Sequence, residues 1–287
     1  MKINLRYVPS ILITLILLTG HISFGILKSY EAVVVAIGTS VVIELVLGRL
    51  FYGEWPNASS GYTSGISVAI LVRSPLLWPF ALCSALSIMS KYVLRFKGRH
   101  IWNPSNFGLC ALFFLAPFAV APLNTQWGNN MWPMLIIWVV GLVTIWRVKR
   151  AHITVTYIAA FLVLAGVRGY ITGDGFWAEA APITGPMYQL FALFMITDPK
   201  TTVSSKTGEI AVTIVIAVVE LFLRLGEVVY APFYALFLVG PIAMIIDLHW
   251  FSDDAATADV GVDDVEEEAE ATRELPEAAP VPAVESA

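Results

Sequence analysis

The stretch GRHIWNPSNFGLCAL, residues 98–112, decides how the chain folds, because it puts polar residues at the entrance of an apolar segment. Proline fits the first turn of a helix, and Asn or Ser beside it satisfies the free backbone amides there. Asn103, Pro104 and Ser105 have this order. The stretch therefore predicts a helix that begins at Pro104, either as a half-helix within a membrane or as a capped helix end at its surface.

The composition around this stretch predicts an all-α protein that crosses a membrane many times. Of the 287 residues, 57% are hydrophobic and 14% are charged, and the mean hydropathy is +0.75. Soluble domains of this size do not normally have such values. At about 20 apolar residues per crossing, we expect ten spans, near residues 8–27, 32–52, 62–74, 76–94, 104–121, 131–147, 152–170, 184–198, 209–225 and 229–248.

The charged residues separate a basic membrane body from an acidic tail. Residues 251–287 hold twelve acidic residues and one basic residue, which leaves 16 basic and 10 acidic residues elsewhere. We expect a transmembrane domain over residues 1–250 and a disordered cytoplasmic tail over residues 251–287. Twelve of the 16 basic residues fall on one side of the ten-span scheme. This bias predicts a multi-pass protein of a bacterial-type inner membrane with both termini in the cytoplasm.

The opening stretch has a counterpart later in the chain. Residues 94–109, LRFKGRHIWNPSNFGL, align with residues 223–238, LRLGEVVYAPFYALFL, and each has glycine six residues before proline. Segments three to five thus echo segments eight to ten. Because five is odd, a second five-segment unit enters the membrane inverted. We expect two inverted five-helix repeats, about 8–121 and about 131–248, with discontinuous helices that line a site.

Four stretches carry a resemblance to a known family: YTSGISVAILVRSP (62–75), SKYVLRFKGRHIWNPSNFG (90–108), FMITDPKTTVSSKTGEI (194–210) and LRLGEVVYAPFYALFLVGPIAMIID (223–247). They resemble the NqrB/RnfD family, the membrane subunits shared by the sodium-translocating NADH:quinone oxidoreductase and the Rnf electron-transport complex. The resemblance implies ten helices in two inverted repeats, a fold likened to urea transporters. It also implies flavin binding and electron transfer, with larger complexes that move sodium or protons.

The resemblance further implies a flavin site. Its candidate residues are Lys91, Arg95, Trp102, Asn103, Pro104, Thr197 and Asp198. Lys91 and Arg95, one turn apart, suit a flavin phosphate or, as ordinary cations at a membrane end, snorkel to its surface. Asp198 either contacts a ligand with Thr197 or caps a helix that begins beyond Pro199.

Family members typically carry FMN on a threonine in a pattern near Asp-x-x-Ser/Thr-Gly-Ala-Thr, between the fifth and sixth helices. The corresponding loop here, APLNTQWGNNMWP (121–133), has Thr125 as its one threonine and no Gly-Ala beside it. We therefore expect that covalent attachment is lost, and that FMN or riboflavin is bound without a covalent bond.

Two carboxylates lie within apolar runs, Glu44 in VVIELVLG and Glu220 in VVELFLRLG. An unpaired charge there costs at least about 2.5 kcal/mol, so both are candidates for an ion path. The alternative is a structural ion pair, for which Arg224, at i,i+4 from Glu220, is the obvious partner.

No metalloprotease, phosphate-loop, nucleophile-elbow or paired-thiol motif occurs in the chain, and we expect no metal site and no nucleic-acid partner. The leading interpretation is a membrane electron-transfer subunit that works with other redox subunits or a separate flavoprotein. One alternative is a channel or secondary transporter for a small solute or cation. Another is a membrane anchor for redox partners.

Overall fold

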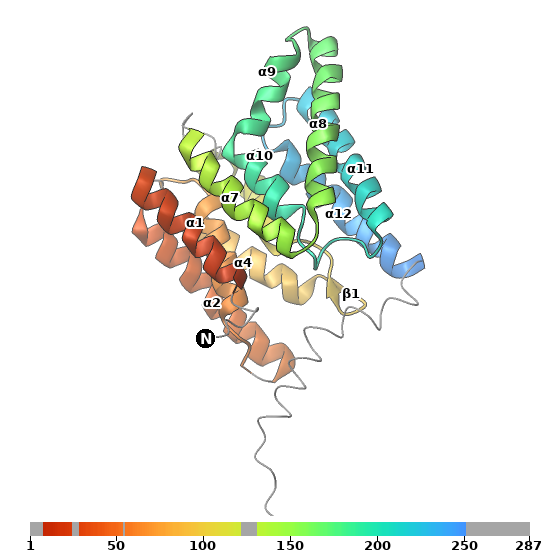
Figure 1. The fold of residues 1–287 in the computed structure, drawn as a ribbon. Helices are drawn as coiled ribbons and strands as arrows, with labels where there is room; N and C mark the ends of the chain where they lie inside the picture. Colours follow the sequence, from red (N-terminus) through yellow and green to blue (C-terminus); the bar gives the residue numbers. More distant parts are fainter. Residues whose placement is uncertain (1–7, 25–28, 54, 122–130, 251–287) are drawn as a thin grey trace, which may run out of the picture. The chain divides into compact units, whose positions relative to one another are not determined.

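A computed structural model describes residues 8–24, 29–53, 55–121 and 131–250 (Figure 1). Within these ranges the chain is helical apart from one two-stranded hairpin of β1 (Arg95–Phe96) and β2 (Arg99–His100). The α-helices are α1 (Val8–Phe24), α2 (Tyr30–Tyr52), α3 (Ser59–Leu71), α4 (Trp78–Val93), α5 (Pro104–Leu115), α7 (Met131–Arg147), α8 (Ala151–Thr172), α9 (Phe176–Ala180), α10 (Pro186–Leu190), α11 (Lys206–Leu225) and α12 (Ala231–Trp250). Short helical turns are η2 (Pro117–Ala119), η3 (Ala181–Thr184) and η4 (Phe191–Met195).

Three of these helices, α2, α8 and α12, are long and apolar enough to span a membrane, which suggests a membrane protein. On α2 the buried side is made of small or polar residues at four-residue intervals: Ala32, Ala36, Ser40, Glu44 and Gly48. Large apolar side chains such as Val34 and Val42 lie on its exposed side. Small residues inside and large apolar residues outside are typical of a helix that packs in lipid.

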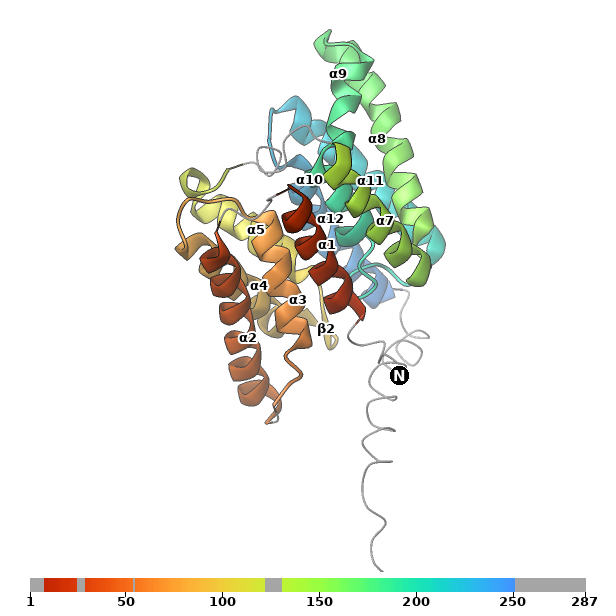
Figure 2. The same ribbon diagram turned by 60° about the vertical axis from the view of Figure 1, so that its left-hand side comes forward.

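Glycines allow α2 and α3 to pack at very short range. Gly61 and Gly65 lie one turn apart on α3 and face the backbone of α2. A Cβ atom on Gly65 would lie 2.6 Å from the Cα atom of Ile37. This Gly-x-x-x-Gly spacing is common where membrane helices approach closely. Figure 2 shows α2, α3 and α4 side by side, and α8 lies against α11 in both views.

All ten segments predicted from apolar runs contain a helix, so the helical prediction is confirmed within the described residues. The segment predicted near 104–121 is shorter than expected, because α5 ends at Leu115 and the turn η2 follows. At 1.5 Å per residue its twelve residues extend about 18 Å, against about 30 Å for a bilayer core. The segment predicted near 184–198 is also short, since α10 passes into a single π-helical turn, η4.

The helix after the second glycine–proline pair differs from that after the first. Gly226 ends α11, and Pro232 lies in the first turn of α12, which is a continuous helix of 20 residues. The prediction of a half-length helix therefore applies to Pro104 and not to Pro232. The chain divides into two compact units, Met1–Ile245 and Ile246–Ala287. The predicted acidic tail, residues 251–287, lies outside the described residues.

Candidate functional site

The start of α5 has the geometry that its sequence predicts. Pro104 is its first residue. The Asn103 side chain caps the helix, because its Oδ1 atom accepts a hydrogen bond from the backbone N–H of Asn106 at 3.0 Å. The preceding hairpin turns through Lys97 and Gly98, which both have positive φ, as two-residue hairpin turns require. The hairpin and the capping bond together hold the side-chain oxygen of Asn103 at the N-terminus of α5.

Asn103 also joins α5 to a segment almost a hundred residues away. Its Nδ2 atom donates to Asp198 Oδ2 at 2.8 Å. The Asp198 carboxylate also accepts from the Lys200 amide at 3.1 Å and from Thr201 Oγ1 at 3.3 Å. Asp198 therefore closes a turn. The alternative in which Asp198 caps a helix is not borne out, because the next helix begins at Lys206 and its cap is Ser205.

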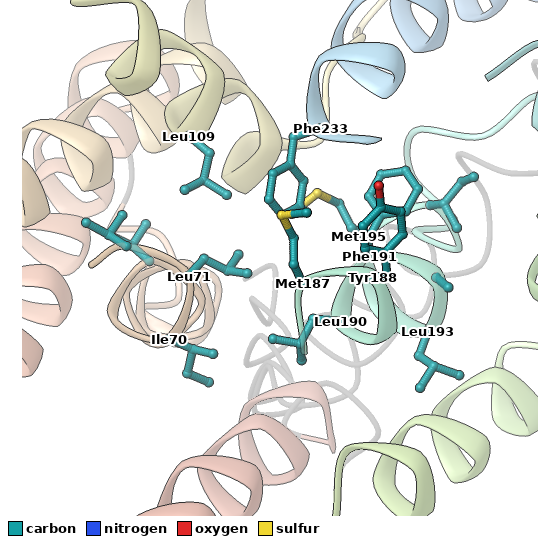
Figure 3. Packing of buried hydrophobic residues seen from close by; sticks show 14 of the residues in the cluster. Ile70, Leu71, Leu109, Met187, Tyr188, Leu190, Phe191, Leu193, Met195 and Phe233 are labelled. Carbon is teal, nitrogen blue, oxygen red and sulfur yellow. The ribbon is translucent and has the colours of Figure 1, made fainter. Parts of the chain in front are cut away.

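Asn106 is a buried polar residue that was not among the predicted site residues. Its Nδ2 atom donates to the Phe233 carbonyl at 3.0 Å and contacts Met195 Sδ at 3.4 Å. Its Oδ1 atom is buried without a hydrogen-bond partner. Figure 3 shows Phe233 close to Met187 and Met195 in this part of the core. One amide thus links α5 to both η4 and α12.

The remaining predicted ligands near α5 make internal contacts. Trp102 Nε1 donates to the Phe237 carbonyl at 2.9 Å, and its ring packs against Phe107 and Phe237. Thr197 is buried, and its hydroxyl donates to the Leu193 carbonyl at 3.0 Å. Trp102 thus joins the start of α5 to α12, whereas the hydrogen bond of Thr197 stays within its own segment.

A cavity of about 90 Å³ lies beside the start of α5. It is lined by Ile13, Ser67, Ile70, Leu71, Asn103, Ser105, Leu190, Phe194 and Met195. Sites for organic cofactors normally have about 300 Å³ or more. The cavity therefore does not fit a flavin, and the polar groups predicted to bind one already have partners within the protein. Its size suits water or a small solute.

Lys91 and Arg95 do not converge on this cavity. Lys91 forms an ion pair with Glu44 and donates to Ser60 Oγ at 2.8 Å. Glu44 is only 2% exposed and also accepts from the Tyr92 hydroxyl at 3.0 Å. Arg95 donates to the Gly98 carbonyl within the hairpin and to the Tyr52 hydroxyl. Of the two predicted ion-path carboxylates, Glu44 is thus paired with a cation.

Glu220 has a different environment. It is 1% exposed, and its Oε2 atom accepts from the Tyr157 hydroxyl at 2.6 Å. Its Oε1 atom is buried with no hydrogen-bond partner. The alternative of an ion pair with Arg224 is not what the structure shows, because the guanidinium of Arg224 lies 3.0 Å from Glu179 instead. The i,i+4 spacing placed both residues on one helix but could not reveal a competing carboxylate on α9.

Two buried ion clusters were missed from the sequence. Glu179 pairs with both Arg168 and Arg224, and Glu209 pairs with Arg150 and His152. Charges near span ends resemble ordinary topology signals, which is why no local pattern indicated that these carboxylates are buried. In the described part of the chain, no group of His, Cys, Asp and Glu could hold a metal ion.

His100 lies in the hairpin outside the helices, and its burial leads us to expect that the stability of the protein depends on pH. Burial lowers its pKa to about 4, against an ordinary value of 6.5. The unfolded chain then binds a proton at a higher pH than the folded protein does, so stability is lost as pH falls from about 6.5 to about 4. We expect a loss of up to about 3 kcal/mol from this group, measured as the unfolding midpoint across that range. His100→Gln should lack this part of the loss, and an unchanged pH profile would contradict the assignment.

Because Asn103 bonds Asp198, we expect two substitutions of Asn103 to lower the stability of the protein by different amounts. Asn103→Ala removes the cap and should cost about 1 kcal/mol. Asn103→Asp keeps a capping oxygen but brings a second carboxylate against Asp198, so it should cost more than the alanine variant. Thermal unfolding in detergent compares the two. An aspartate variant as stable as the parent would show that the contact does not form.

Thr125, the one candidate for covalent attachment of flavin, lies outside the described residues. No protein-family model matches the chain, and no curated protein is significantly similar to it.

Proposed function

We propose that the chain crosses the inner membrane ten times, in two inverted halves of five segments, with both termini in the cytoplasm. One support is the likeness between α2 and α8, the second segments of the two halves. They have 23 and 22 residues, and each ends at a glycine in the left-handed conformation, Gly53 and Gly173. In the first half α2 packs against α4, and in the second half α8 packs against α11.

Each of these helix pairs also contains a buried Glu–Tyr hydrogen bond. Glu44 of α2 accepts from Tyr92 of α4, whereas Glu220 of α11 accepts from Tyr157 of α8. The carboxylate and the phenol have exchanged helices between the two pairs. The two bonds therefore lie in corresponding helix pairs but involve residues that do not correspond, and what supports the inverted arrangement is the packing of α2 on α4 and of α8 on α11.

Within this arrangement, the function that we favour is that of a membrane subunit of an Rnf- or Nqr-type electron-transport complex. One observation supports the proposal: the four stretches that resemble that family, though separated by up to about 150 residues, contribute residues around the start of α5. Ser67, Ile70 and Leu71 of the first stretch line the cavity together with Asn103, the Asn103 side chain bonds Asp198, and Asn106 bonds the backbone of Phe233. These contacts join the four stretches or the residues directly beside them.

The flavin of such a complex is not placed in the cavity beside α5, which is too small for it. FMN or riboflavin would be bound without a covalent bond and outside this cavity, where the chain meets its redox partner. In this proposal the polar residues around the start of α5 have a structural role, because they hold α5 against the neighbouring segments. The partner that fits this role is another subunit of the complex or a separate flavoprotein.

The test is the visible absorption of the native complex, extracted in mild detergent through a tag on this chain. We expect flavin that is released into the supernatant by acid and lost when partner subunits are stripped. Flavin retained in the acid pellet would contradict the non-covalent assignment. A native preparation with neither flavin nor a redox-active partner would contradict the electron-transport function.

The cavity itself favours a second candidate, a channel or transporter for a small solute or cation. Its volume of about 90 Å³ and its polar groups on Asn103 and Ser105 fit a small polar molecule at a helix N-terminus. Solute flux into liposomes that contain the chain alone, without any chromophore, would support this candidate. Flux that persists when Ser105→Leu fills the cavity would exclude the cavity as the route.

A further inference from the structure

The packed faces of α8 and α11 carry a row of buried and partly buried polar side chains, which we call the α8–α11 seam. Its members from α8 are His152, Tyr157 and Arg168, and those from α11 are Glu209, Thr213, Glu220 and Arg224. From Glu209 to Arg224 the helix rises about 22 Å, at 1.5 Å per residue. The row therefore spans most of a bilayer core of about 30 Å.

Glu220 is the central group of the seam. One of its oxygens is held by the Tyr157 hydroxyl at 2.6 Å, and the other is buried without a hydrogen-bond partner. The Tyr188 hydroxyl of α10 is a second hydrogen-bonding neighbour of the carboxyl group, and Arg224 acts on it through its charge but forms its ion pair with Glu179. A buried carboxyl group with an unused acceptor and no paired cation is a rare arrangement in membrane helices and marks ion or proton pathways.

Both ends of the seam have charged clusters that connect it to its surroundings. At one end Glu209 pairs with Arg150 and His152. At the other end Glu179 pairs with Arg168 and Arg224. These clusters place charged side chains at each end of the row, with one titratable imidazole, His152, at the Glu209 end.

A small cavity lies between the first cluster and Glu220. It has a volume of about 20 Å³ and is lined in part by Glu209, Thr213 and Ile216. A space of this size holds one water molecule. The lining of the cavity reaches Ile216, which precedes Glu220 by one helical turn, so the cavity ends about 6 Å of helix rise before Glu220.

From this geometry we propose that the α8–α11 seam conducts protons and that Glu220 carries the proton across its middle. A hydronium ion at the cavity gives a proton to a water molecule that enters the turn between Ile216 and Glu220, and that water gives a proton to the Glu220 carboxylate, which becomes the acid. The acid then gives that proton to water at the Glu179 end, which restores the carboxylate. Only O–H bonds form and break, and the membrane potential or a pH difference drives the movement. Tyr157 positions the carboxyl group and is a positioning residue. This path goes beyond the proposed electron-transport function, because it requires no flavin and no redox partner.

The experiment uses the full chain reconstituted alone into liposomes that contain a pH-sensitive dye. A potassium gradient with valinomycin makes the interior negative, and the dye reports the rate of proton entry. We expect entry above that of empty liposomes, a loss of about tenfold or more in Glu220→Gln, and a smaller loss in Tyr157→Phe. Glu220→Asp should keep part of the rate. The matched control is Glu227→Gln, which changes an exposed carboxylate two residues beyond α11 and should keep the full rate.

Several outcomes would overturn the proposal. Proton entry no faster than in empty liposomes would do so, as would sodium entry without proton entry. An undiminished rate in folded Glu220→Gln would also do so. If that variant does not fold, folded Tyr157→Phe with the parent rate is equally contrary. Because the chain is tested without flavin and without redox partners, the outcome of this experiment is independent of the electron-transport proposal, and either proposal can fail while the other stands.

Discussion

Replacing Gly65 with alanine is expected to destabilise the protein severely. The new Cβ atom would lie 2.6 Å from the Ile37 Cα atom and 3.0 Å from the Ala36 carbonyl oxygen. These are backbone atoms, which cannot move aside as a side chain can, so α3 would have to separate from α2. Overpacking a well-packed site costs typically 1–3 kcal/mol, and we expect about 3 kcal/mol or more here. The yield of monodisperse protein and its unfolding midpoint in detergent measure the effect.

The matched control is Gly38→Ala on the neighbouring helix. A Cβ atom at Gly38 meets nothing within 4 Å, so this variant should be at least as stable as the parent. Equal unfolding midpoints for the Gly65 and Gly38 variants would contradict the close packing of α2 on α3.

The second large effect is expected at the buried pair of Lys91 and Glu44. Lys91→Met removes the cation and leaves Glu44 buried with only the Tyr92 hydroxyl on its carboxylate. Breaking a buried pair from one side costs about 3–5 kcal/mol. We expect the lower part of that range, because the lysine side chain is 22% exposed. The unfolding midpoint of the single variant measures the loss.

A double variant separates charge from packing. Glu44→Gln with Lys91→Met removes both charges, and it should recover most of the stability that Lys91→Met loses. If the double variant is no more stable than the single variant, the lysine contributes through its packing and not through the ion pair.

The helices could be predicted from the sequence because apolar runs of sufficient length encode them locally. The start of α5 was also predictable, since Asn103 and Pro104 act on the backbone beside them. The end of the same helix was not, because Leu115 and Pro117 lie within a run that remains apolar to residue 121.

Contacts between distant segments could not be predicted from the sequence. Asn103 and Asp198 were both candidate residues, yet their bond depends on how α5 and η4 pack. Arg224 was assigned to Glu220 by spacing alone, whereas the fold brings Glu179 to it from another helix. Partner choice among buried charges is decided by tertiary packing, and one chain's sequence contains no local signal for it.

The number of membrane crossings underlies every proposal made above, and labelling of single cysteines tests it most directly. With Cys83 and Cys110 replaced by alanine, cysteine is introduced as Phe118→Cys, in the turn after α5, or as Lys200→Cys, after η4. Both positions are exposed. In ten crossings, an impermeant maleimide labels the Phe118→Cys variant in intact cells and the Lys200→Cys variant only after permeabilisation. If α2, α8 and α12 alone crossed the membrane, with the same cytoplasmic C-terminus, the two results would be reversed, and the inverted architecture would be refuted.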